Sequence, residues 1–263
     1  MFRRCKGLER RLHIAAVVFA WCLCIPAAYA GSLDFPPSDF DIMGSESERV
    51  IGHGRYEITR LDNGRATALG EDRFDDGEYD VERDDLEFNG DQIPRMLTFE
   101  HAFFNADGTL QRVNKADSQT GRASCTEYQN GKSTVRDTIL QVPADTFAGS
   151  AIVIPMRGHL TRGERERITL HDFNCIPGPE ILGVRAYLQP LSKWAHFSNE
   201  VVAVDIKPDF GWLNLLVDPF MPEIRAWFDP ADDWRFVGAK FTRYYKGPEI
   251  LLALRKKQGT QAR

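Results

Sequence analysis

Short runs of alternating hydrophobic and polar residues, separated by turn residues, occupy most of the chain. In Arg95–Phe104, for example, Leu97, Phe99 and Phe103 share one set of alternate positions. Asn63-Gly64 and Asn130-Gly131 are typical of type I′ hairpins. So many turns at short intervals, with little helical periodicity between them, predict an all-antiparallel sheet. The predicted strands are Val50–Thr59, Ala66–Phe74, Glu78–Phe88, Arg95–Phe104, Leu110–Ala116, Ala123–Gln129, Thr134–Val142, Glu164–Phe173, Ile181–Pro190, Glu200–Lys207, Glu223–Phe228, Trp234–Phe241 and Glu249–Leu254.

An apolar, proline-bounded insert, Ile139–Leu160, interrupts this rhythm. Asp145 follows Pro143 as a good N-cap, and an apolar stripe recurs at i, i+3, i+4 and i+7 from Phe147. This spacing predicts a short helix that ends near Pro155. Gly149 and the β-branched run that follows favour a buried strand instead. Both readings bury the insert.

A second apolar segment, Asp209–Met221, connects two predicted strands and is bounded by Pro208 and Pro222. A contiguous apolar patch normally marks a contact surface, so we do not expect this connector to remain in water. The chain shows no repeat or composition shift. We therefore predict one β domain over residues 49–254, after an irregular leader at 31–48 and before a basic tail at 255–263.

The first thirty residues are typical of a cleaved signal peptide. Met1–Arg11 is basic, Leu12–Ile25 is apolar, and Ala28-Tyr29-Ala30 matches an A-x-A cleavage site. The alternative is a membrane anchor, but the apolar run is short of the roughly 20 residues that a span needs. We expect cleavage after Ala30, a periplasmic or secreted protein, and no transmembrane segment in the mature chain.

Composition and charge limit the classes of partner. The 263 residues are 43% hydrophobic and 27% charged, which is typical of a globular protein. Removing residues 1–30 takes away five basic residues and one acidic residue, so the net charge changes from −5 to −9. Before the Arg255-Lys256-Lys257 tail, the mature chain has no cluster of basic residues that could neutralise phosphates. A nucleic-acid partner is therefore not expected.

Cleavage leaves two cysteines, Cys125 and Cys175, in an oxidising compartment. A disulfide between them is the natural expectation. The alternative is two free thiols, because the sequence cannot show whether the Cα atoms come within bonding range. If the bond forms, it links the strands on either side of the insert.

Sequence motifs for metal binding or nucleophilic catalysis do not match. No two mature histidines have zincin spacing, and the acidic run Glu71–Asp85 fails the EF-hand pattern at Phe74 and Arg83. Because alternation along a strand points these carboxylates to opposite faces, we expect a solvated hairpin there. Ser150 is not in a G-x-S-x-G elbow and is expected to be a small packing residue. We predict no metal, no cofactor and no assigned catalytic residue.

Two weaker kinds of site stay open. A pair of carboxylates, as in glycosidases, needs a separation that sequence spacing cannot test. The tryptophans at 194, 212, 227 and 234 can pack in the core, stack on a sugar or line a lipid cavity.

These features, together with the central P-A-D-T-F-A-G-S segment and the closing W-F-D-P-A-D-D-W-R-F-V-G unit at Trp227–Gly238, resemble bacterial periplasmic proteins whose sheet is similar to that of the LolA/LolB lipoprotein carriers. The resemblance covers roughly residues 49–254. It implies a single antiparallel curved sheet or incomplete β-barrel, with a short helical plug around residues 145–157. It also implies an acyl chain as an occupant of the concave face.

Three functions follow, in decreasing order of preference. The first is a periplasmic carrier of an apolar ligand. The second is an envelope protein that docks a protein partner through the connector. The third is a hydrolase that uses a carboxylate pair or His171 with a remote acid. The sequence indicates no oligomeric state. The carrier predicts a ligand site lined by Phe147, Ile152, Ile154, Met156, Trp212, Leu216 and Phe220.

Overall fold

The computed structural model describes residues 35–255 except 62, 89–92, 165–166, 218–223 and 244–246. The predicted signal peptide at 1–30 and the tail at 256–263 therefore lie outside the described residues. Within the described part of the chain, no helix combines the length and the hydrophobicity needed to cross a membrane.

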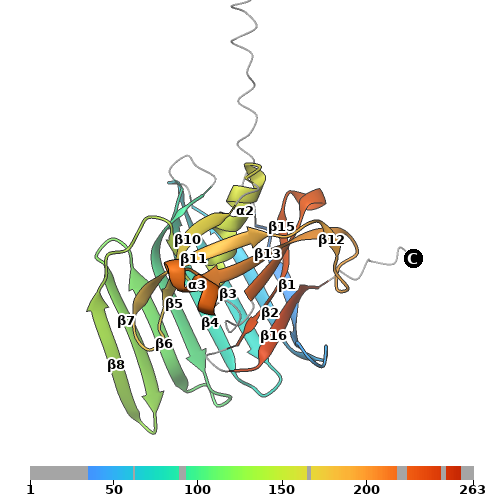
Figure 1. Ribbon diagram of the computed structural model, residues 1–263. Helices are drawn as coiled ribbons and strands as arrows, with labels where there is room; N and C mark the ends of the chain where they lie inside the picture. Colours follow the sequence, from blue (N-terminus) through green and yellow to red (C-terminus); the bar gives the residue numbers. More distant parts are fainter. Residues whose placement is uncertain are drawn as a thin grey trace, which may run out of the picture. The chain divides into compact units, whose positions relative to one another are not determined.

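The described residues form one large open sheet, curved but not closed into a barrel, so the mainly β prediction is confirmed. The strand order is β8-β7-β6-β5-β4-β3-β2-β1-β16-β15-β14-β13-β11-β10-β9, and β12 pairs with β13 (Figure 1). Neighbours in sequence are therefore mostly neighbours in the sheet. The bounds are β1 Ser38–Gly44, β2 Val50–Arg60, β3 Arg65–Phe74, β4 Tyr79–Glu87, β5 Arg95–Phe104, β6 Leu110–Asp117, β7 Arg122–Gln129, β8 Lys132–Ile139, β9 Thr146–Phe147, β10 Ile168–Asn174, β11 Glu180–Leu188, β12 Ser192–Lys193, β13 Glu200–Pro208, β14 Ile224–Asp229, β15 Arg235–Thr242 and β16 Glu249–Leu254.

Turn chemistry accounts for the regular meander. Asn130 and Gly131, between β7 and β8, have φ values of 52° and 73°, as a type I′ turn requires. The prediction of an all-antiparallel sheet has one exception, because β9 pairs with β10 in parallel. This short strand belongs to the insert.

The leader prediction missed β1. Ser38–Gly44 lie between β2 and β16 in the sheet, where Phe40 and Ile42 are buried. The alternation of Phe40 and Ile42 with Asp39 and Asp41 is present in the sequence. It is short, however, and Pro36-Pro37 directly before it is typical of irregular chain.

The insert is mainly helical, as predicted, but its helical part starts later. After β9 come η1 (Gly149–Ile152) and α2 (Val153–Thr161). Pro155 does not end the helix. It lies in the first turn of α2, where backbone N–H groups have no intrahelical acceptor to lose. Asp145 is not the N-cap either, since its Oδ1 lies 2.8 Å from His171 Nδ1.

The main hydrophobic core lies between the insert and both arms of the sheet, which are the strands toward its β8 end and those toward its β9 end. It includes Phe99 on β5 and Phe173 on β10, whose rings lie 5.7 Å apart edge to face. A second cluster packs on other residues of β13 to β16, with Trp194 stacked on Trp227 at 4.3 Å. Gly238 on β15 is needed there, because a Cβ atom would lie 2.4 Å from the Trp194 ring.

The connector after β13 forms two short helical turns, η2 (Gly211–Leu213) and α3 (Asn214–Val217). Residues 218–221 of the predicted connector lie outside the described residues.

Candidate functional site

A row of acidic side chains faces the inside of the curved sheet beneath the start of the insert. On β4, alternate residues point inward, and these are Asp80, Glu82 and Asp84. Glu82 is 4% exposed and Asp84 is fully buried. Asp72 of β3 is paired with Asp80 in the strand register. The acidic run was expected to be a solvated hairpin, and that expectation was wrong for this face.

Glu82 holds the first turn of the insert. Its carboxylate accepts hydrogen bonds from the Ser150 backbone N–H at 2.9 and 3.2 Å and from the Ser150 hydroxyl at 2.5 Å. Gly149 has a φ of 50°, and a Cβ atom there would lie 2.0 Å from Glu82 Oε2. Glycine is therefore required by both the backbone conformation and the close approach. Ser150, expected to be a packing residue, is an anchor.

His101 on β5 lies beside the acidic row. Its Nε2 lies 2.8 Å from Asp80 Oδ1, and its Nδ1 lies 3.5 Å from Glu82 Oε2. Burial alone would lower the pKa of His101. The contact with Asp80 and the negative charges of Glu82 and Asp80 outweigh burial, so the pKa is raised.

Asp84 and Tyr56 carry polar atoms with no hydrogen-bond partner in the part of the chain that the structure describes. These atoms are both carboxyl oxygens of Asp84 and the hydroxyl of Tyr56. Burial, with the nearby charge of Glu82, raises the pKa of Asp84 well above its ordinary value. Burial and the charges of Asp84 and Glu82 also raise the pKa of Tyr56. An unpaired charge is costly inside a protein, so the neutral acid is the favoured form of Asp84.

Two further carboxyl groups titrate near neutral pH. Burial, followed by the charges of Asp80 and Glu82, raises the pKa of Asp72 to about 7. Burial and the charge of Glu82 raise the pKa of Asp172, on β10, to about 7. The acidic row and the carboxyl groups beside it can therefore bind and release protons in the physiological range. Across the described residues, no group of three or more histidine, cysteine, aspartate or glutamate side chains could hold a metal ion.

Arg157 fixes the other part of the insert. It lies on α2 and is 5% exposed. Its Nε donates to the carbonyl oxygen of Asp233 at 3.0 Å, and its Nη2 to Asp233 Oδ2 at 2.8 Å. Sequence reasoning missed this contact, because Asp233 belongs to the turn between β14 and β15, far along the chain.

The residues predicted to line a ligand site fall into two separate groups. Phe147, Ile154 and Met156 are fully buried in the main core, and Ile152 packs against it. Trp212 and Leu216 are 80% and 63% exposed on the connector. Phe220 lies outside the described residues. A ligand-binding role for these seven residues stays a prediction.

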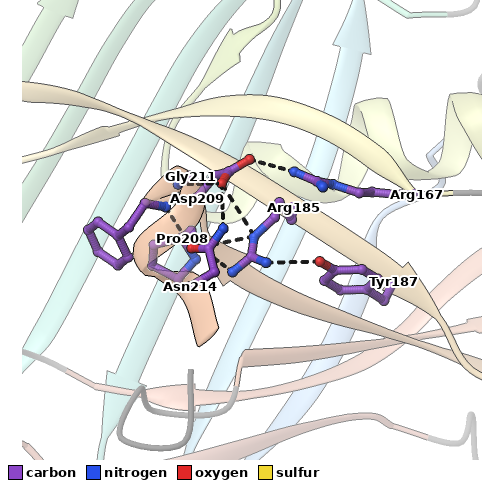
Figure 2. A network of polar contacts seen from close by, with 8 residues as sticks. Arg167, Arg185, Tyr187, Pro208, Asp209, Gly211 and Asn214 are labelled. Carbon is purple, nitrogen blue, oxygen red and sulfur yellow. Dashed lines mark hydrogen bonds and ion pairs between the residues drawn. The ribbon is translucent and has the colours of Figure 1, made fainter. Parts of the chain in front are cut away.

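The connector is held by a polar network around Asp209 (Figure 2). Asp209 Oδ1 accepts hydrogen bonds from the Gly211 N–H at 2.9 Å and the Asn214 side chain at 2.8 Å. Asp209 Oδ2 accepts one from Arg167 at 2.5 Å. The hydrogen bonds from Asn214 and Gly211, with the charges of Arg167 and Arg185, hold the pKa of Asp209 below its usual value.

Arg185 completes this network from β11. The side chain is 5% exposed and donates to the Pro208 carbonyl at 3.0 and 3.3 Å and to the Tyr187 hydroxyl at 3.0 Å (Figure 2). The start of the connector is thus fixed to the sheet. The apolar side chains that it carries nevertheless face solvent, with Leu215 at 90% exposure.

Two further predictions concern the disulfide and the environment of His171. The Cys125–Cys175 disulfide is confirmed, with a Cα–Cα distance of 5.8 Å, and it links β7 to the residue after β10. His171 lies 2.8 Å from Asp145 Oδ1, and both side chains are more than a third exposed. This pair lies outside the acidic row of β4.

The chain was also compared with known proteins. No protein-family model, no curated protein and no solved structure matches it. The resemblance to the lipoprotein carriers therefore stays a prediction, and the case for a function depends on the geometry.

Proposed function

We propose that the protein is a periplasmic binding protein for an apolar ligand such as an acyl chain, which takes the place of the insert on the concave face of the sheet. The observation that carries this proposal is how the insert is attached. Its strand β9 is paired with β10, whereas its helical part covers the inner face with apolar side chains and is held by two polar contacts, Ser150 to Glu82 and Arg157 to Asp233. The helical part, η1 and α2, can therefore move while β9 stays paired with β10.

The energetics of such an exchange are balanced. Moving η1 and α2 exposes the fully buried Ile154, Met156 and Leu160 and uncovers Phe147 of β9, which makes four large side chains. At about 1.5–3 kcal/mol each, this costs roughly 6–12 kcal/mol. An acyl chain regains about 0.8 kcal/mol for each buried methylene, so roughly 8 to 15 methylenes offset the loss. Common fatty-acyl lengths fall within this range.

A fluorescent acyl probe added to delipidated protein tests the proposal. We expect saturable binding to the wild type. Arg157→Met should bind the probe more tightly, because it removes one attachment of the insert. Arg122→Met, a change at an exposed residue of β7, should bind like the wild type. No saturable binding by either the wild type or Arg157→Met would overturn the proposal.

A second candidate function is docking of an envelope protein through the connector. The specific observation is the exposure of Trp212, Leu215 and Leu216 on a segment whose start is fixed by Asp209. From Phe210 to Val217 the sequence FGWLNLLV carries no charge, so we propose a partner with a neutral, apolar surface.

Site-specific photo-crosslinking at Leu215 in cells, followed by a binding assay with the purified partner, tests this candidate. Leu215→Ser should abolish binding of that partner and leave acyl-probe binding unchanged. Leu191→Ser is a matched control, because Leu191 is half exposed elsewhere on the molecule. Crosslinks to lipid or to a second copy of the chain would contradict a protein partner.

A further inference from the structure

The acidic row beneath the insert contains more buried carboxyl groups than its hydrogen bonds require. Glu82 alone contacts the insert through Ser150. Asp84, two residues along the same face of β4, is fully buried, and neither of its oxygens has a partner among the described residues. The Tyr56 hydroxyl beside them is likewise unpartnered. An apolar side chain at Asp84 would avoid the cost of burying a polar group without a partner.

Six groups from six elements face Glu82 and Asp84, and three of the six are aspartates. Positive charge comes from His101, whose ring contacts Glu82 and Asp80, while Arg243 acts on Asp72 and Arg112 on His101. The facing groups are Tyr56 of β2, Asp72 of β3, Asp80 of β4, His101 of β5 and Asp172 of β10, with Ser150 of η1 above them.

We propose that this acidic row, together with Asp72, His101 and Asp172 around it, is a buried proton-binding site that holds the first turn of the insert. Loss of protons from this site releases residues Gly149–Ile152. Its role as a gate for an apolar ligand depends on the function proposed above. The release of the turn itself does not.

The charges of these groups change with pH. Below neutral pH, Asp84 is neutral beside the Glu82 carboxylate, which accepts hydrogen bonds from Ser150. His101 then carries a positive charge beside Asp80 and Glu82. As pH rises, Asp72 and Asp172 each lose a proton to solvent and His101 loses a third. These carboxylates repel one another strongly in a buried setting.

Solvent can reach the row on the side where the insert starts. Gly149 and Ser150 are exposed, although the Glu82 carboxylate below them is buried. Water that entered to solvate the new charges would compete with Ser150 for Glu82. Because Gly149 already lies against Glu82 Oε2, the first turn has to lift to admit water.

Hydrogen exchange of the insert peptide, measured between pH 5.5 and 8.5 and corrected for the intrinsic exchange rate, tests the proposal. In the wild type, the opening constant of Gly149–Ile152 should rise about tenfold or more over this range, because several coupled protons are released. In Asp72→Asn and in Asp172→Asn the rise should be less than about threefold, because each variant lacks one of the carboxyl groups that lose a proton over this range. Asp137→Asn, on exposed β8, should behave like the wild type.

Constant protection of the wild-type insert across this pH range would overturn the proposal. So would a rise in both variants equal to that of the wild type. Either variant keeps the test valid if the other fails to fold, since Asp72 and Asp172 are both only partly buried. If the insert opens with pH but the acyl probe never binds, the proton site stands and the carrier function fails. If the acyl probe binds but the protection of the insert does not change with pH, the carrier function stands and the proton site fails.

Discussion

Removal of the Cys125–Cys175 disulfide should lower the free energy of unfolding by about 4 kcal/mol. The bond closes a loop with a sequence separation of 50. With a loop-closure entropy of 2.1 + 1.5R ln n cal/mol/K, this loop gives about 4 kcal/mol at 25 °C. In the sheet order, β7 is next to one terminal strand and β10 is next to the other. The bond therefore joins strands that lie near the two opposite ends of the open sheet.

The assay is urea denaturation of the Cys125→Ala/Cys175→Ala variant, followed by circular dichroism and by tryptophan fluorescence. The wild type in reductant is the matched control, because it keeps both sulfur atoms in place and loses only the bond. Both should unfold at lower urea than the oxidised wild type. A loss below about 1 kcal/mol in both would refute the reasoning, since it would mean that the reduced chain retains the constraint through packing or residual structure.

Three further predictions concern the insert and the acidic row. Phe147→Ala should cost about 3–5 kcal/mol in urea denaturation, because the ring is fully buried; a loss below 1 kcal/mol would contradict its place in the core. The stability of the wild type should fall as pH rises from about 4 to about 7, since the folded pKa of Asp172 is about 7 and its ordinary value is 3.8. This group accounts for at most about 4 kcal/mol of the free energy of unfolding. Urea denaturation of Asp172→Asn at a series of pH values should therefore lack that part of the pH dependence. Arg157→Met should cost about 1–3 kcal/mol in thermal unfolding, and Asp233→Asn less, because asparagine tolerates the φ of 46° at this position and the backbone carbonyl of residue 233 still accepts from Arg157; equal losses would contradict this assignment.

The sheet could be predicted from the sequence because its strands alternate and its turns have local signals. The predicted bounds of β5 and β16, Arg95–Phe104 and Glu249–Leu254, agree with the structure. The insert was predicted to be helical, but its start depends on Glu82, whose partner Ser150 lies 68 residues away in sequence. Local propensity carries no information about such a contact.

The acidic row could not be predicted for a related reason. Alternation correctly assigned the carboxylates of Glu71–Asp85 to two faces of the hairpin. Charged residues are rarely buried without a partner, so a solvated hairpin was the natural expectation. The insert reverses this expectation, because it covers one face and leaves the other in water. Only the tertiary position of the insert decides which carboxylates are buried.

The disulfide and the acidic row lie at the same level of the sheet, and this limits how the protein can respond to charge. The strand register runs from Glu82 to His101, then Asn114, then Cys125. Cys175 follows β10, which also carries Asp172. Repulsion between Glu82 and Asp172 would push the two arms apart, but the covalent bond prevents separation at that level. The first turn of the insert is held to Glu82 of β4 by hydrogen bonds and not by a covalent bond, so it is the part that can move. In the reduced protein the same charges should separate the arms instead, and amides of β10 should then lose protection together with those of the insert.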